Sequence, residues 1–384
     1  MAVTKIDISL LEDVGGANNL VKLDSNAKIP AGPATNLLNK PGPLTSTSDP
    51  AIDSNKALGT EWLNSTSGEM YICTDATTDL NTWTNVGAGS GNIEPWIYQG
   101  TQYGYTSGSG DPLTDAIEKH SYTADGNATD VANLTRARNS TNGHSSATHG
   151  YISAGGGAPH TYIEKFSFAA GTNAVSTGYY LSHGNAVRQD SATTSDKNYG
   201  YCAGGAALNV IDRFSYTTDG TATDVGDILA TGFGLAGASS ETYGYAAGYS
   251  APYSNVIQKF AFGSSANATD VGDLTNTIVG ATGHQSATHG YKMGGSQNGT
   301  YTTAASSIQK WTFASDANAT NVGTTTVGRY EHASGSSTTH GYASGGSNAV
   351  GGNVIEKVSF TTDGNATDVG DLVTSRSYCS GQQY

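Results

Sequence analysis

The stretch Gly341-Tyr-Ala-Ser-Gly-Gly346, followed by Ile355-Glu-Lys-Val-Ser-Phe360, decides the fold because both parts recur along the chain. A glycine–tyrosine pair returns every 44 to 51 residues, and an isoleucine-led run follows each pair. Recurrence at such a period indicates stacked supersecondary units, none of which buries its apolar surface alone. The pairs begin at Gly104, Gly150, Gly200, Gly244, Gly290 and Gly341, and the runs begin at Ile117, Ile163, Ile211, Ile257, Ile308 and Ile355.

Each copy predicts four short strands. They are the Gly-Tyr strand, the isoleucine-led strand, a strand beginning at Asp-Val-Gly-Asp-Leu, and a small polar strand such as 332–339. In the isoleucine-led strand the second, fourth and sixth residues share one face. Radial stacking would cover both faces of each sheet, whereas a solenoid needs shorter and more uniform repeats. We therefore predict an all-β fold in which residues 93–384 form a six-bladed β-propeller, with repeats of about 47 residues.

The last copy predicts how the ring closes. The first copy lacks a small polar strand before its Gly-Tyr pair, and the chain carries an extra one at Arg376–Tyr384. We expect this C-terminal segment to complete the first sheet.

Composition excludes several classes of partner. Lys and Arg number 18 against 32 Asp and Glu, a net charge of −14, and charged residues make up only 13% of the chain. So few cations cannot neutralise a phosphate backbone, which argues against nucleic-acid binding. No apolar run reaches the length of a membrane span, so membrane insertion is not expected. The three cysteines are far apart and form no metal-binding or disulfide pattern.

The repeat resembles a kelch-type β-propeller repeat, most clearly from Arg329 to Gly346 and on to Arg376. It departs from the kelch pattern because the expected tryptophan between the third and fourth strands is absent. The glycine pair is also broken in the first and fourth copies and shifted by one residue in the second. The resemblance thus implies a kelch-like propeller, and strict membership stays open.

The N-terminal 92 residues lack the repeat. Residues 1–45 contain several Gly and Pro residues and read as extended, turn-broken chain. Residues 46–92 predict a small β-hairpin module, with Ser67 and Gly68 between two alternating runs. The stretch Leu20–Ala31 is similar to a segment near the N-termini of bacteriophage tail-fibre and related virion proteins. The stretch Gly59–Trp83 is similar to a small module of the same proteins.

This second resemblance implies a phage virion structural protein. The expected role is that of a tail fibre or tail-associated appendage, located in the virion. Its N-terminus would bind other virion or tail proteins, and its propeller would recognise host cell-surface polysaccharide. The habit of phage fibres suggests a homo-trimer. Two rivals are an architectural part, such as a capsid decoration or tail nozzle component, and a polysaccharide depolymerase. The residues of the matching stretch that we assign to virion anchoring are Leu20, Leu23, Asp24, Lys28, Ile29 and Pro30.

The loop between the Gly-Tyr strand and the isoleucine-led strand varies most between copies. Loops on a rigid scaffold often carry binding residues, and aromatic side chains with nearby amides suit sugars. The alternative is that these loops are solvated and bind nothing. The ligand-binding candidates are His160, Tyr162, Tyr253, Asn298 and Tyr301.

No catalytic motif, cofactor site or metal site is predicted. The repeated Asp-Gly-Asn-Ala-Thr-Asp run lacks the bidentate Glu of a calcium loop, so we interpret it as a turn. His149, His289 and His340 occupy a position where other copies have Tyr, which indicates packing more than metal binding. The Glu-Lys neighbours that recur in the isoleucine-led strands predict ion pairs between adjacent copies.

Overall fold

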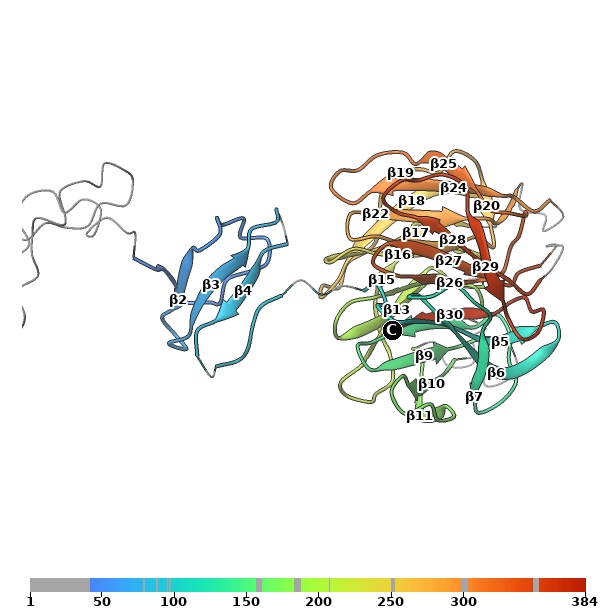
Figure 1. The fold of residues 1–384 in the computed structure, drawn as a ribbon, viewed down its shortest axis with the longest axis horizontal. Coiled ribbons are helices and arrows are strands. Elements are labelled where there is room, and N and C mark those ends of the chain that lie inside the picture. Colours follow the sequence, from blue (N-terminus) through green and yellow to red (C-terminus); the bar gives the residue numbers. More distant parts are fainter. Residues whose placement is uncertain are drawn as a thin grey trace, which may run out of the picture. The chain divides into compact units, whose positions relative to one another are not determined.

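The computed structural model describes residues 42–384 apart from 79, 88, 95, 97, 157–160, 183–187, 207, 250–252, 298–302 and 348–351. The regular elements within these residues are all β-strands, which confirms the predicted all-β class (Figure 1). The chain divides into two compact units, with the boundary between residues 95 and 96. In the described part of the chain no helix is long and apolar enough to span a membrane.

The first unit contains one four-stranded sheet. Its strands β1 (Leu44–Ser46), β2 (Glu61–Asn64), β3 (Met70–Asp75) and β4 (Thr82–Asn85) lie in chain order. The β1–β2 pair is parallel and the other pairs are antiparallel. Strands β2 and β3 form the predicted hairpin, and Gly68 at its turn has a left-handed φ of 78°. The small core consists of Tyr71, Cys73 and Trp83.

The second unit contains six four-stranded antiparallel sheets, numbered here 1 to 6 along the chain. Sheets 1 to 3 are β30 (Ser380–Gln383), β5 (Tyr103–Gly110), β6 (Leu113–Ser121), β7 (Thr129–Asn133); β8 (Asn142–Ser145), β9 (His149–Ser153), β10 (Tyr162–Ser167), β11 (Val175–Tyr180); and β12 (Ala192–Ser195), β13 (Tyr199–Ala203), β14 (Val210–Ser215), β15 (Thr223–Asp227). Sheets 4 to 6 are β16 (Ala236–Ser239), β17 (Tyr243–Tyr249), β18 (Ser254–Ala261), β19 (Thr269–Asp273); β21 (Thr282–Gln285), β22 (His289–Met293), β24 (Ser307–Thr312), β25 (Thr320–Thr324); and β26 (Ala333–Ser336), β27 (His340–Ser344), β28 (Val354–Ser359), β29 (Thr367–Asp371). A short ladder joins β20 (Ile278–Val279) to β23 (Ser296–Gln297).

The apolar core of this unit lies between sheets. Each of its hydrophobic clusters combines residues of two consecutive sheets, and one cluster joins sheet 6 to sheet 1. The tyrosine of each Gly-Tyr pair packs on an aromatic ring of the next sheet, with ring centroids 4.5–5.1 Å apart. The six ring pairs are Tyr105–Phe168, Tyr151–Tyr216, Tyr201–Phe262, Tyr245–Phe313, Tyr291–Phe360 and Tyr342–Tyr122.

The glycine of the Gly-Tyr pair makes room for an aromatic ring of its own sheet. A Cβ atom at Gly200 would lie 2.5 Å from the ring of Phe214, and one at Gly150 would overlap the ring of Phe166. Both rings belong to the fourth residue of the isoleucine-led run, directly opposite the glycine in the ladder. The glycine of the repeated pair therefore packs against a ring of its own sheet, and the tyrosine packs against a ring of the next sheet.

The turn between the third and fourth strands of each sheet binds the preceding sheet. In all six sheets an alanine N–H in this turn donates to a backbone carbonyl at the end of the preceding sheet's outer strand, from Ala174→Asn133 in sheet 2 to Ala128→Asp371 between sheets 1 and 6. In five of them a turn asparagine also accepts a backbone N–H, as Asn127 does from Asp371. The prediction that Asp and Asn of this run act in a turn is confirmed.

The C-terminal strand completes sheet 1, as predicted. Strand β30 pairs antiparallel with β5, from Ser380 opposite Ser107 to Gln383 opposite Gly104 (Figure 1). It also contacts β26 and β8, the first strands of sheets 6 and 2. Contacts between successive first strands thus run through all six sheets and return to the start.

Buried ion pairs brace four of the sheets internally. An arginine that precedes the first strand meets the acid of the isoleucine-led run in the same sheet. The pairs are Arg138–Glu164 at 3.4 Å, Arg188–Asp212 at 3.2 Å, Arg329–Glu356 at 3.2 Å, and Arg376–Glu118. The prediction that these acids pair between adjacent copies was wrong. Each acid forms its ion pair with an arginine of its own sheet.

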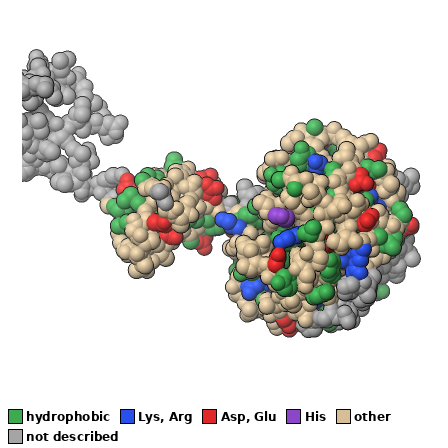
Figure 2. Space-filling view, turned by 90° about the horizontal axis from the view of Figure 1, so that it is seen from below, with side chains coloured by type: hydrophobic (Ala, Val, Ile, Leu, Met, Phe, Trp, Pro, Cys, Tyr) green, Lys and Arg blue, Asp and Glu red, His purple; other side chains and the backbone are tan. Residues whose placement is uncertain are grey.

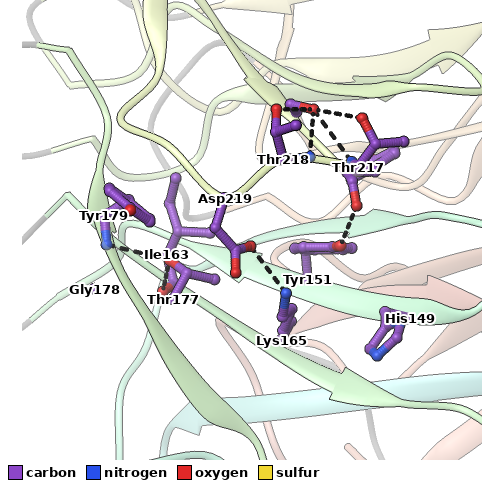
Figure 3. Close-up of polar contacts among 12 residues, drawn as sticks. His149, Tyr151, Ile163, Lys165, Thr177, Gly178, Tyr179, Thr217, Thr218 and Asp219 are labelled. Carbon is purple, nitrogen blue, oxygen red and sulfur yellow. Dashed lines mark hydrogen bonds and ion pairs between the residues drawn. The ribbon is translucent and has the colours of Figure 1, made fainter.

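The lysine of the same run does pair between sheets. Lys165 of β10 reaches Asp219 in the β14–β15 turn of sheet 3, at 2.9 Å (Figure 3). Lys259, Lys310 and Lys357 make the same contact with Asp316, Asp363 and Asp125. Where the next sheet has Gly171 or Ser265 in place of the aspartate, the cation lies over a tyrosine ring of its own sheet instead, as Lys119 does on Tyr103 and Arg213 on Tyr199.

Deletion of residues 377–384 should lower the melting temperature by at least ~10 °C, because it removes the first strand of sheet 1 and its contacts to two neighbouring sheets. Thermal unfolding followed by circular dichroism measures this effect. An unchanged melting curve would contradict the role of β30 in closing the unit.

Arg329→Ile should destabilise the protein by about 3–5 kcal/mol, because it leaves Glu356 charged and fully buried. The double change Arg329→Ile with Glu356→Gln should recover more than half of that loss. It copies sheet 5, where Ile278 and Gln309 hold the two positions. Urea unfolding of the single and double variants tests this; a double variant no more stable than Arg329→Ile would refute it.

Candidate functional site

The loops on the two faces of the second unit differ in regularity. On one face, five first-to-second strand loops have three residues each, and all six third-to-fourth strand loops have seven. On the other face, the second-to-third strand loops have two residues in sheet 1 (111–112) and thirteen in sheet 5 (294–306). Antiparallel pairing places these two sets of loops at opposite ends of the strands. We call them the constant face and the variable face.

The variable face carries the described members of the predicted binding set. Tyr253 belongs to the sheet 4 loop and its side chain is 53% exposed. Tyr162 is half-buried, and the guanidinium of Arg138 lies 5.2 Å from the centre of its ring. Tyr162 therefore supports a buried ion pair rather than offering a free ring. His160, Asn298 and Tyr301 lie outside the described residues, as do Leu20, Leu23, Asp24, Lys28, Ile29 and Pro30.

A narrow polar cavity of about 80 Å³ lies between the first strands of the sheets. Glycines allow these strands to approach: a Cβ atom at Gly283 would overlap the carbonyl oxygen of Gly237, and one at Gly381 would overlap that of Ser334. The cavity has room for a few water molecules and is well below the roughly 300 Å³ of an ordinary ligand pocket. The space between the first strands is therefore a packed centre and not a substrate site.

A ring of six left-handed residues surrounds the cavity on the variable face. Each residue stands immediately before the segment that leads into a first strand, and φ lies between 49° and 73° in all six. Five backbone hydrogen bonds of 2.8–2.9 Å connect them in series from sheet to sheet. The series runs Ser140→Tyr378→Glu331→Gly280→Gly234→Asp190, each N–H donating to the next carbonyl.

Two carboxyl groups of this ring face each other. Asp190 leads into sheet 3 and Glu331 into sheet 6, which lies opposite in the cyclic order, and both line the axial cavity. The Asp190 carboxyl is hydrogen-bonded to the side chains of Ser140 and Glu331. Burial raises the pKa of Asp190 to about 6, and these hydrogen bonds oppose the rise. Asp190 is therefore protonated below this pH, which allows its carboxyl to donate to the Glu331 carboxylate.

Two cysteine thiols and two histidine rings of the second unit are buried and neutral. Burial raises the pKa of the Cys202 thiol to about 12 and that of Cys379 to about 11, so neither is a thiolate nucleophile. Burial lowers the pKa of His144 and of His284 to about 4, and both rings bond to neighbouring sheets. In the described residues no group of three or more His, Cys, Asp or Glu could hold a metal ion. Figure 2 shows charged side chains dispersed among uncharged ones on the face in view.

The opposite mouth of the cavity, on the constant face, is covered by the start of the second unit. We call residue 96 together with residues 98–102 the lead-in segment. The Tyr98 hydroxyl is 3.2 Å from the Ser195 hydroxyl at the end of β12, and the Gln99 side chain donates to the carbonyl of Gln285 at the end of β21. Gly100 donates to the carbonyl of Ser336 at 2.8 Å. The lead-in segment therefore closes one end of the axis, and the Asp190–Glu331 pair closes the other.

Comparison with protein-family models and with curated protein sequences finds no match to this chain.

Sequence reasoning missed Asp190 and Glu331. Each lies two residues after an arginine of the repeat, so aligned copies do place them at one position with Ser140, Gly234, Gly280 and Tyr378. That position differs in residue type in almost every copy, which is the signal that could have drawn attention to it.

Asp190→Asn should raise the melting temperature more at pH 7 than at pH 4. The fold binds the Asp190 proton more tightly than the unfolded chain does, so this group's contribution to stability falls as pH rises from about 4 to about 6. Asn keeps the size of the side chain and removes the titration. Asp130→Asn, at an exposed position of β7, is the control and should show no such pH-dependent gain. Equal effects of Asp190→Asn at both pH values would contradict the raised pKa of Asp190.

Proposed function

We propose that residues 96–384 form a six-bladed β-propeller. The cyclic order of the sheets supports this: ring stacking, alanine hydrogen bonds and first-strand contacts each connect every sheet to the next, including sheet 6 to sheet 1. Six four-stranded sheets in such an order, with small residues at a crowded centre, fit the propeller architecture. The kelch-like repeat pattern agrees with it.

We further propose that this propeller is the display domain of a phage virion protein, a tail fibre or tail-associated appendage, and that its variable face recognises host-surface polysaccharide. The observation that carries this proposal is the contrast between the two faces. Loop lengths of the constant face repeat from sheet to sheet, whereas those of the variable face range from two to thirteen residues on the same framework. A rigid scaffold with one set of divergent loops is a common arrangement for binding.

The N-terminal residues supply the virion part of the proposal. The similarity of Leu20–Ala31 and Gly59–Trp83 to virion proteins motivates an anchoring role for the first unit and the segment before it. An architectural virion part without a receptor would have the same anchor, so adsorption to cells is the property that separates the two functions.

Tyr253→Ser should leave the melting temperature unchanged and weaken adsorption of particles to host cells severalfold. Tyr253 is exposed on the variable face, so its side chain can be changed without opening a cavity in the core. Tyr243→Ser is the matched control, since Tyr243 is a partly exposed tyrosine of the same sheet at its other end. Equal adsorption by both variants and the parent would favour the architectural function.

A further inference from the structure

A second cavity, of about 240 Å³, lies on the constant face beside the lead-in segment. Its walls include Trp96, Tyr98 and Thr101 of that segment, Ser146 and Ala147 of the β8–β9 loop, and Tyr384. The lead-in segment precedes the first repeat and has no counterpart in the others, so the walls that it supplies are not repeated in the other sheets. It is independent of the variable loops.

The aromatic walls of this cavity are held by the framework. The rings of Trp96 and Tyr98 lie 5.2 Å apart at 40°, and the backbone N–H of Trp96 donates to the Glu241 carboxylate at 3.2 Å. The Tyr98 hydroxyl bonds to Ser195, and the Tyr384 ring stacks on Phe168 at 5.1 Å. Tyr98 lines both this cavity and the axial one, as do Ser145 and Gln383. A surface fixed in this way needs little ordering when a ligand binds.

The chemistry of the walls suits an uncharged ligand with one apolar face. None of the lining residues is Asp, Glu, Lys or Arg, so no side chain is present to pair with a charged group. The three aromatic rings offer apolar surface, and the exposed Thr101 hydroxyl lies beside them. The Ser146 hydroxyl and the Gln99 amide also line the cavity, and they bond to the carbonyls of His149 and Gln285. Thr101 and Ala147 are exposed, which places the opening on their side.

We propose that this cavity binds a single neutral hexose unit. Aromatic side chains pack against the C–H face of a pyranose, and a hydroxyl at the rim, such as that of Thr101, can bond to the sugar hydroxyls. The volume is below the roughly 300–1,000 Å³ of pockets for larger ligands, which limits the occupant to about one sugar ring. The proposal depends on this cavity and not on the proposed display function.

The test is a titration of the full chain with glucose, galactose, mannose and N-acetylglucosamine, followed by saturation-transfer NMR and tryptophan fluorescence. Saturable binding of at least one of the four is expected. Ala147→Phe should weaken it at least tenfold by filling the cavity from an exposed loop position. Ala287→Phe is the control, because Ala287 is exposed in an identical Ser-Ala-Thr-His-Gly loop of sheet 5 that does not line the cavity.

Trp96→Ala should also weaken binding at least tenfold, and Tyr253→Ser should leave it unchanged. Absence of saturable binding for all four sugars would overturn the proposal, as would parental affinity in Ala147→Phe. Loss of hexose binding in Tyr253→Ser but not in Ala147→Phe would place the sugar on the variable face and equally overturn it. Reduced cell adsorption by Tyr253→Ser alone bears on the display function and leaves the hexose proposal standing.

Discussion

The stacking of one tyrosine per sheet on an aromatic ring of the next sheet is the contact on which the second unit depends. Each sheet has apolar residues on both faces and too few residues to cover either, so its core exists only together with its two neighbours. The Tyr342–Tyr122 contact, at 4.5 Å, joins the last sheet to the first and is of the same kind as the others. Stability is therefore a property of the complete cycle, and an interruption at any sheet exposes apolar surface on two others.

The buried ion pairs show how the repeat tolerates variation. Four sheets have an arginine with an acid, while sheets 4 and 5 have Gly232 or Ile278 together with Gln258 or Gln309. Both forms keep one constant feature, since the acid or amide oxygen accepts a backbone N–H from the loop before the first strand, as Gln258 does from Leu229 and Glu356 from Thr326. The charge appears only where a countercharge is present, which is what the cost of an unpaired buried charge requires. The hydrogen bond is thus common to all six sheets, whereas the ion pair is present in four of them.

Much of this framework could be predicted from the sequence, because the repeat presents the same residues in six contexts. The strand order, the turn function of the Asp-Gly-Asn-Ala run, the lysine pairs between sheets and the closing C-terminal strand all follow from positions that recur. Features that occur once could not be found in this way. The Asp190–Glu331 contact joins residues of opposite sheets, and the Trp96–Tyr98 wall belongs to a segment outside the repeat. The acid in the isoleucine-led strand was assigned to the wrong partner. The alternation of side chains along a strand shows which face of the sheet the acid occupies, but not that an arginine of the same sheet lies beside it.

The closure of sheet 1 by β30 sets a condition on biosynthesis. Strand β30 follows its partner β5 by about 270 residues, so at about 5–20 residues per second tens of seconds separate the emergence of the two strands from the ribosome. Throughout that interval the edge of β5 carries unpaired backbone groups and its Gly-Tyr ring has no complete surroundings, which is a state prone to pairing with other chains. Translation speed and chaperone capture should therefore govern the yield of folded protein more than its final stability does.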